Sequence, residues 1–254
     1  MTSKLDLPRV AHDPLSARVG FWAALLTALL TATAFAFAIR AIPISGPNCP
    51  GDCVAYPFAD VAHKVPGDYI WMYVAVLHTL TYIVMMVALA DVLRARRHIF
   101  AQIALAFATM GAVSIIADYY IQIAVAQPSI VQGEFEGFAL LTQYNAHGVF
   151  IALEDMGYFL KAVAFFFVAL PFAGGRGLER AIFLVLSTGG AIGVLAWFVM
   201  YAIYGFTLEY RYEVLALSVD WLLLIVGGAL LALWFRRMTT CTLQMQSVLP
   251  PQMA

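Results

Sequence analysis

The stretch FIALEDMGYFLKAVAFFFVAL, residues 150–170, decides the fold class. A helix of roughly 20 apolar residues crosses a hydrocarbon core about 30 Å thick, and this stretch has that length. It nevertheless contains Glu154, Asp155 and Lys161. An ionised side chain at the centre of a membrane helix costs roughly 2.5–3.5 kcal/mol on insertion scales. The sequence therefore predicts a membrane helix whose charged side chains face partners or water.

The composition of the whole chain indicates the same class of protein. Its residues are 63% hydrophobic and only 11% charged, and the mean hydropathy is +0.86. Soluble domains are about 25% charged. The net charge of −1 gives no basic surface for nucleic acid, so we expect no nucleic-acid partner. The chain is expected to be an integral membrane protein with membrane lipids as neighbours.

Long apolar runs predict an all-α bundle of six transmembrane helices in one domain, residues 20–235. The expected spans are 20–42, 68–92, 99–126, 146–172, 180–206 and 211–235. A polar leader, 1–19, has no short apolar core with a cleavage site, so we expect the first helix to be retained. Residues 236–254 form a polar tail.

The distribution of Lys and Arg predicts the orientation of the bundle. Under a six-span count, one side holds Lys4, Arg9, Arg18, Arg94, Arg96, Arg97, Arg176, Arg180, Arg236 and Arg237. The other side holds Arg40, Lys64 and Arg211. Because basic residues concentrate in cytoplasmic loops, we expect both termini in the cytoplasm.

Two cysteines, Cys49 and Cys53, lie in the predicted outer loop, residues 43–67. Close cysteines in an oxidising compartment most often form a disulfide, which is the pairing we expect. A redox or metal pair is the alternative, although two cysteines supply too few ligands for a closed zinc site. The third cysteine, Cys241, lies in the tail.

Ionisable residues recur at one depth in four of the predicted spans. Counted from the outer end of each span, each lies about nine or ten residues in, roughly 14 Å at helical rise: His78, Asp118, Glu154, Asp155 and Asp220. This agreement predicts a single polar layer. The alternative is that these groups only hydrogen-bond the helices together.

Helical periodicity predicts which side chains join this layer. On the fourth span one face holds His147, Glu154, Tyr158 and Lys161, and the other spans contribute Tyr82, Gln122, Trp197 and Tyr201. We expect a chamber that narrows inward from the outer side, with Lys161 as the counter-ion of Glu154. Since four carboxyl groups crowd around one lysine and one histidine, at least one carboxyl is expected to stay protonated.

The segment 127–145 is too polar to span the membrane and too apolar for an exposed loop. It is predicted to be an interfacial helix over the mouth of the chamber. It could act as a lid or as a plain connector.

Three stretches, CPGDC (49–53), IADYYIQ (116–122) and TQYNAHGVFIALEDMGY (142–158), resemble a group of small bacterial multi-span membrane proteins. The similarity covers most of the chain. It implies a place in the bacterial cytoplasmic membrane, but it implies no activity and no site residue.

The chemistry of the predicted chamber favours an enzyme that uses buried carboxyl groups for general acid–base catalysis on an apolar, lipid-like or isoprenoid-like molecule. The reaction would be an isomerisation, cyclisation or hydrolysis. Glu154 and Asp220 would be the principal acid and base, Asp118 and Asp155 would set their protonation, and His78 would relay protons. The expected substrate contacts are Tyr82, Gln122, His147, Tyr158, Lys161, Trp197 and Tyr201. We expect neither a cofactor nor a metal.

Two other functions fit the same residues. A proton-coupled carrier of small molecules also needs carboxyl groups beside a lysine inside the membrane. An assembly or sensory subunit would instead use the polar layer to bind a partner helix, for example in a homo-oligomer. The sequence contains no visible inverted repeat or interrupted helix pair of the kind that many carriers have.

Overall fold

The structure, a computed structural model, describes residues 14–41, 45–49, 51, 53–95 and 98–248. Six of its helices are long and apolar enough to cross a membrane. Their cores are α1 (Pro14–Ala38), α2 (Ile70–Val92), α3 (His98–Ile121), α6 (Val149–Ala169), α7 (Leu178–Tyr204) and α8 (Tyr210–Val248). The described residues contain no strand, so the fold is the predicted all-α membrane bundle of six helices.

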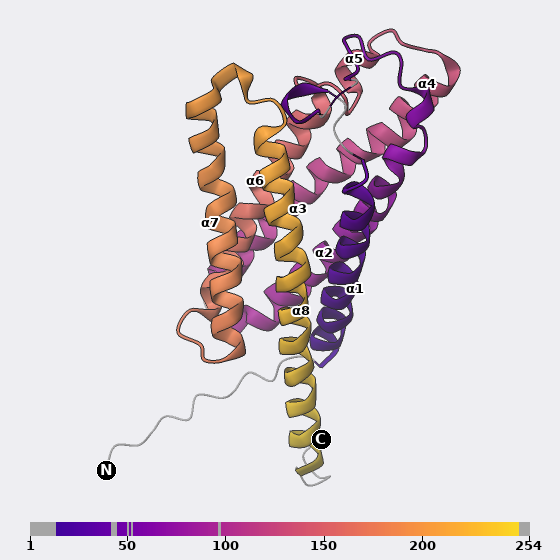
Figure 1. Cartoon of the computed structure of the whole chain (residues 1–254). Helices are drawn as coiled ribbons and strands as arrows, with labels where there is room; N and C mark the ends of the chain where they lie inside the picture. Colours follow the sequence, from indigo (N-terminus) through magenta and orange to yellow (C-terminus); the bar gives the residue numbers. More distant parts are fainter. Residues whose placement is uncertain (1–13, 42–44, 50, 52, 96–97, 249–254) are drawn as a thin grey trace.

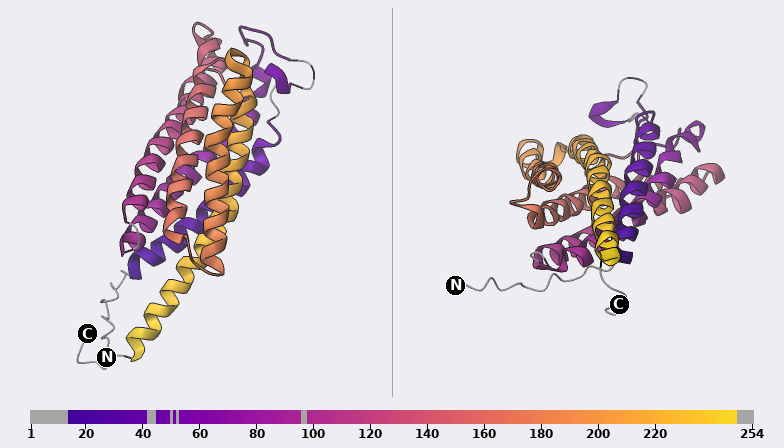
Figure 2. Two further views of the ribbon diagram at one scale, coloured as in Figure 1. Left: turned by 90° about the vertical axis from the view of Figure 1, so that its left-hand side faces the viewer. Right: turned by 90° about the horizontal axis from the view of Figure 1, so that it is seen from below.

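The six helices form a closed ring (Figures 1 and 2). Each packs against the next in the order α1, α2, α3, α6, α7 and α8, and α8 returns to α1. Helix α6 also contacts α8 across the ring. In α6, 56% of an apolar 18-residue stretch is buried, which is the highest share among the six spans. The charged stretch that opens α6 therefore lies at the centre of the bundle.

Short helices connect the long ones. At one end of the bundle lie η1 (Gly46–Asn48), η2 (Ala62–Lys64), η3 (Gly67–Tyr69), α5 (Phe138–Leu141) and η7 (Gly205–Thr207). We call this the outer end, following the expected orientation. The inner end carries η4 (Leu93–Ala95) and η6 (Leu170–Phe172). The start of α1 and the last turns of α8 lie at the inner end (Figure 1).

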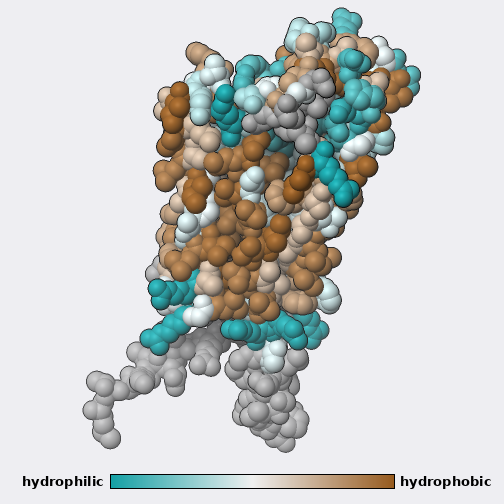
Figure 3. Space-filling view, viewed as in Figure 1, coloured by the Kyte–Doolittle hydropathy of each residue, from teal (hydrophilic) through white to brown (hydrophobic). Residues whose placement is uncertain are grey.

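On the face shown in Figure 3, apolar side chains form a broad band between two hydrophilic ends. Such a band matches the hydrocarbon part of a bilayer, in which backbone groups are satisfied within helices. The ends hold the loops that carry most of the basic residues. The chain is therefore a multi-pass membrane protein.

Several helix boundaries differ from those predicted. Helix α1 begins at Pro14 instead of residue 20, because proline is well suited to the first turn of a helix. Helix α8 continues to Val248, so much of the expected tail is helical. The start of the leader, residues 1–13, lies outside the described residues.

The third span also runs further than predicted. A π-helical segment, η5 (Gln122–Ala126), joins α3 to α4 (Gln127–Gln132), and α4 ends at Gly133, which adopts a left-handed conformation. The single interfacial helix predicted over 127–145 is therefore wrong. Its first part prolongs the third span, and only the short α5 follows, because Gly133 and Gly137 with positive φ interrupt the chain.

In the outer loop, Cys49 and Cys53 are joined as a disulfide, as predicted. The bond closes a small loop next to η1 and so ties down the chain between α1 and α2. Residues 42–44 lie outside the described residues, and so the start of the predicted loop 43–67 does too.

A close helix contact joins α3 and α6. A Cβ atom added at Gly111 would lie 2.8 Å from the carbonyl oxygen of Gly157, and one added at Gly157 would lie 2.6 Å from the Ile115 side chain. Small residues let membrane helices approach in this way. The approach brings the outer part of α3 against the charged turns of α6.

Candidate functional site

Two pairs of ionisable residues face one another across α6 and α8. The two helices cross the membrane in the same direction, and each carries its pair with a spacing of seven residues: Glu154 and Lys161 on α6, Glu213 and Asp220 on α8. Seven residues correspond to about 10 Å along a helix. The site therefore has an outer level at Glu154 and Glu213 and a deep level at Lys161 and Asp220.

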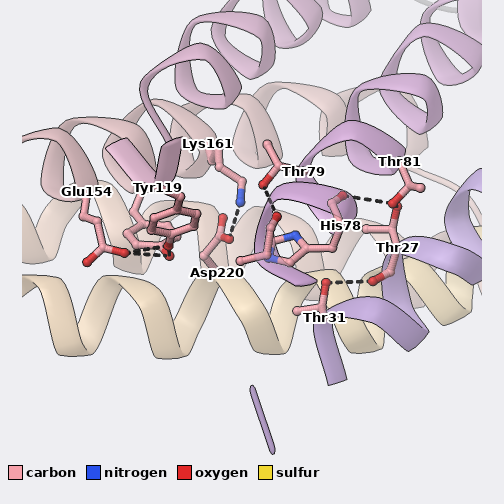
Figure 4. A network of polar contacts seen from close by, with 11 residues as sticks. Thr27, Thr31, His78, Thr79, Thr81, Tyr119, Glu154, Lys161 and Asp220 are labelled. Carbon is pink, nitrogen blue, oxygen red and sulfur yellow. Dashed lines mark hydrogen bonds and ion pairs between the residues drawn. The ribbon is translucent and has the colours of Figure 1, made fainter. Parts of the chain in front are cut away.

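At the outer level, Glu154 is fully buried and is held by tyrosine hydroxyls. The hydroxyl of Tyr119 on α3 donates to Glu154 Oε1 at 2.6 Å, and the Tyr158 hydroxyl lies 3.4 Å from the same oxygen (Figure 4). The hydroxyl oxygens of Tyr119 and Tyr158 are themselves 2.6 Å apart. These contacts fix one carboxylate oxygen of Glu154 and leave Oε2 without a donor among the described residues.

The carboxyl group of Glu213 lies close enough to the Glu154 carboxyl for the two to interact electrostatically. A third carboxyl, that of Asp118 on α3, lies close enough to both to interact electrostatically. Asp118 is 1% exposed, and neither of its oxygens has a hydrogen-bond partner in the described part of the chain.

At the deep level, Lys161 Nζ donates to Asp220 Oδ2 at 2.6 Å (Figure 4). Both side chains are buried, with exposures of 0% and 3%. The Lys161 ammonium also lies 5.2 Å from the ring centre of Tyr82 and 5.4 Å from that of Tyr158. The ion pair and the two rings together offset the cost of burying the lysine.

His78 on α2 completes the deep level. Its ring packs edge-on against Trp221, with the centres 5.5 Å apart, and neither ring nitrogen has a hydrogen-bond partner among the described residues. Beyond it, Thr81 donates to the His78 carbonyl at 2.9 Å and Thr27 donates to Thr81 at 2.9 Å. Thr31 in turn donates to the Thr27 carbonyl at 2.7 Å, and this contact ends the network drawn in Figure 4.

An outer cavity of about 180 Å³ leads to the outer level from the outer end of the bundle. Ends of α1, α2, α6 and α8 and the chain before α6 enclose it. Its lining includes Phe35, Ile39, Asp68, Trp71, Gln143, Tyr144, Phe150, Ile151, Tyr210, Glu213, Val214 and Leu217. Glu213 is thus the point where the cavity meets the buried carboxyl groups.

Hydrogen bonds hold the mouth of the outer cavity. The Tyr144 hydroxyl donates to Asp68 Oδ2 at 3.2 Å, and Ser45 bonds both the Tyr144 carbonyl and the Tyr210 hydroxyl. Burial raises the pKa of Tyr144 above its usual value, because the phenolate would lose its hydration. Tyr144 therefore stays protonated and remains a donor to Asp68.

The deep level offers no comparable space among the described residues. The gap between α6, α7 and α8 beside Asp220 has no room for a water molecule. Beyond the threonines next to His78, the buried side chains of the described residues toward the inner end are apolar, among them Met85, Leu89, Phe165, Val168, Leu224, Leu231 and Phe235. In this part of the chain, the polar site is therefore connected to the outer end.

The structure brings eight of the predicted site residues together. They are His78, Tyr82, Asp118, Glu154, Asp155, Tyr158, Lys161 and Asp220, although Asp155 lies at the edge and is only half-buried. The prediction of a single polar layer is wrong, because the shared spacing of seven residues on α6 and α8 divides the residues into two levels. For the same reason Lys161 pairs with Asp220 and not with Glu154.

Four predicted substrate contacts lie elsewhere. His147 is exposed and precedes α6, which begins only at Val149. Gln122 is buried but bonds the backbone of the connecting segment, donating to the Leu141 carbonyl at 2.6 Å and accepting from the Gln143 amide at 3.2 Å. Both residues therefore shape the outer end without reaching the carboxyl groups.

The aromatic residues of α7 are the other two. Trp197 packs on Phe159 of α6, with ring centres 5.7 Å apart, and stacks on Tyr201, which is 48% exposed. Phe159 lies on a different face of α6 from Glu154, so Trp197 and Tyr201 lie outside the lining of the outer cavity. The aromatic wall comes instead from α1, α2, α6 and α8.

Three residues of the site were given no role by the sequence prediction. Glu213 lies seven residues before Asp220 on one helical face, so its position was a usable signal. Tyr119 follows Asp118 directly, and Trp71 lies seven residues before His78. Trp71 lies against Tyr119, with ring centres 5.1 Å apart, and separates the cavity from the deep level.

In the described part of the chain, no group of three or more His, Cys, Asp or Glu side chains is arranged to hold a metal ion. Comparison of the chain with protein-family models, with curated proteins and with solved structures gives no match. The functional argument therefore depends on the geometry of the site.

Proposed function

We propose that the chain is a membrane-embedded enzyme that performs general acid–base chemistry at the Glu154–Glu213 carboxyl pair, on a small lipid-soluble molecule that enters from the outer end. One observation carries this proposal: Glu213 lines the outer cavity and lies close enough to the buried Glu154 for the two carboxyl groups to interact electrostatically. Two carboxyl groups that share a proton supply an acid and a base at one place.

The chemistry that fits best is an isomerisation. The protonated member of the pair would give its proton to one atom of the substrate, and the carboxylate would remove a proton from a neighbouring atom. The pair then holds its one proton on the other carboxyl, and transfer of that proton between the two carboxyls restores the starting state without another reactant. The hydroxyl of Tyr119 stabilises negative charge on Glu154 while the proton is away.

The deep level has a supporting role in this proposal. Lys161 and Asp220 are paired with each other and have no space beside them for a substrate. The ammonium group of Lys161 lies one level below Glu154, where it moderates the negative charge of the carboxyl groups. The role of catalytic base, which the sequence suggested for Asp220, is therefore given to Glu213.

The cavity size narrows the choice of substrate. A volume of about 180 Å³ is close to that of an engineered cavity of about 150 Å³ that holds benzene. It suits a ring or a short branched chain more than an elongated isoprenoid. We place the protein in a bacterial cytoplasmic membrane with its Arg-rich inner end toward the cytoplasm.

Deuterium transfer tests the acid–base proposal and can itself reveal which molecule is the substrate. Purified protein in lipid nanodiscs is incubated in heavy water with a membrane lipid extract, and small lipid-soluble molecules are compared by mass spectrometry. We expect time-dependent deuterium incorporation into a defined compound with the native protein. Glu213→Gln should abolish it, because the pair loses a proton donor.

Glu136→Gln is the matched control, since Glu136 is exposed and does not line the cavity. It should retain full incorporation. Equal incorporation in the native protein and in a folded Glu213→Gln variant would contradict the proposal.

A second candidate, a proton-coupled carrier, is supported by a different observation. Asp118, Glu154 and Glu213 lie together, and no lysine or arginine of the described residues forms an ion pair with any of them. Protons are therefore their natural counter-ions. A carrier predicts solute-driven proton movement into liposomes that Asp118→Asn abolishes. Deuterium incorporation without such proton movement favours the enzyme.

A further inference from the structure

We propose that the outer cavity binds a small apolar cation, such as a protonated amine with a hydrocarbon body. This inference rests on the proposed function for its setting, because it names the ligand class of the same site. For an acid–base isomerase, such a cation resembles the positively charged species that forms when a substrate is protonated.

The charges around the outer cavity are of one sign. Among the described residues, its lining contains the carboxyl groups of Asp68 and Glu213 and no Lys, Arg or His side chain. Arg211, which follows the lining residue Tyr210, is held away by the Thr207 carbonyl and by Glu209, the latter at 3.3 Å. A bound cation would therefore meet attraction without competition from a resident positive charge.

Buried carboxyl groups lie directly behind this lining. Glu154 is 0% exposed, its Oε2 has no hydrogen-bond donor in the described residues, and its carboxyl faces Glu213. Asp118, 1% exposed and equally without a donor in that part of the chain, lies beside them. Carboxyl groups without a cation inside a membrane protein favour the arrival of one.

Aromatic rings form most of the remaining wall. Phe35, Trp71, Tyr144, Phe150 and Tyr210 all line the cavity. The faces of such rings attract cations, Trp most strongly, and they also pack well against hydrocarbon. The combination of rings and carboxyl groups recognises an organic cation better than an inorganic ion, which would have to give up its water.

The volume sets the size of the ligand. About 180 Å³ accommodates one substituted ring, such as benzylammonium or cyclohexylammonium. Two-tailed lipids and long-chain amines exceed it. Two lining residues at the outer ends of α1 and α8 are exposed, Ile39 at 63% and Val214 at 40%, so an amphipathic cation can reach the cavity from the membrane interface.

Paired ligands test the proposal. Binding of benzylammonium and of benzyl alcohol, which have nearly the same shape but differ in charge, is measured by the fluorescence of the full-length protein in nanodiscs and by calorimetry. We expect benzylammonium to bind at least roughly tenfold more tightly than the alcohol. Trp71→Phe should remove most of the fluorescence change and identify the cavity as the site.

Two variants locate the charge requirement. Glu213→Gln and Asp68→Asn should each weaken benzylammonium binding and leave benzyl alcohol binding unchanged, whereas Glu136→Gln should change neither. Asp68→Asn serves as the second variant because Asp68 is at the mouth, where a substitution disturbs the buried carboxyl pair least.

Equal affinities for the two ligands in the native protein would overturn the proposal, and so would benzylammonium binding that all folded variants retain. This failure is distinct from that of the proposed function. Deuterium incorporation with no preference for the ammonium would refute only the ligand class, and tight ammonium binding without incorporation would refute only the enzyme.

Discussion

Lys161 and Asp220 depend on each other more than any other residues of the site. Removing one member of a buried pair leaves the other charge unpaired and costs about 3–5 kcal/mol. We therefore expect Lys161→Met to lower the free energy of unfolding by about that amount. Thermal unfolding in detergent, followed by circular dichroism, measures the change.

The double variant Lys161→Met/Asp220→Leu should recover most of this loss, since two apolar residues of similar volume replace the pair. Arg211→Met is the surface control, because its pair with Glu209 is partly exposed and worth at most about 1 kcal/mol. A single variant as stable as the native chain would show that the pair does not form.

The hydroxyl of Tyr119 is the next most important group. It donates to Glu154 and contacts Tyr158, and both partners are buried. We expect Tyr119→Phe to cost about 1–3 kcal/mol of stability and to slow deuterium incorporation, because Glu154 loses its closest donor. The adjacent Tyr120 is 64% exposed, so Tyr120→Phe should leave both measurements within error.

Residue types and spacing predicted most of the residues that meet at this site. Glu154, Lys161 and Asp220 were found because charges in apolar runs need partners. Glu213 shares a face with Asp220, but the sequence prediction gave it no role. Lys161 was predicted to pair with Glu154, but it bonds Asp220. This pairing depends on how far α6 and α8 are shifted along their axes relative to each other, and the sequence of one helix does not determine that shift.

Among the helices, the contact between α3 and α6 positions the outer level. A Cβ at Gly111 would meet the Gly157 carbonyl oxygen at 2.8 Å and Lys161 Cγ at 2.9 Å. We expect Gly111→Ala to push the helices apart, to cost about 1–3 kcal/mol and to weaken the contact between Tyr119 and Glu154. Gly67→Ala, where nothing lies within 4 Å, should be neutral. Unfolding and benzylammonium affinity measure the two effects, and an unchanged Gly111→Ala variant would contradict the close packing.

Helical periodicity identifies the inward face of a helix but not the neighbour it meets. Trp197 does face α6, yet it meets Phe159 and not the carboxyl groups. His147 was placed on the face of Glu154 by extending the helix backward past Gly148, although α6 begins only at Val149. The π-helical turn at Gln122 likewise breaks the 3.6-residue period, so that residue bonds the connecting segment instead.

At the scale of the whole molecule, all buried charged groups of the described residues lie midway or toward the outer end. In a chain with Cys241→Ser, Leu217→Cys should react with a small cationic methanethiosulfonate reagent added on the side opposite the C-terminus, because Leu217 lines the outer cavity. Leu231→Cys, which replaces a residue that is 1% exposed, should react from neither side. Labelling of Leu217→Cys from the side of the C-terminus would contradict a cavity that opens at the outer end.

The number of spans, the helical class and the disulfide followed from the sequence alone, because apolar length and cysteine spacing are local properties. The outer cavity did not. Its walls come from four helices and from the chain before α6, and its volume depends on how the side chains of distant segments fill the space between them.

The apolar inner part of the bundle has an electrical consequence. Moving one elementary charge through the whole membrane against 100 mV requires about 2.3 kcal/mol. A proton that reaches Glu154 through the outer cavity crosses only a fraction of this field, and the hydrocarbon-like packing around Leu231 and Phe235 insulates it from the opposite compartment. The protein should therefore work at nearly the same rate in an energised cell and in one whose membrane voltage has collapsed.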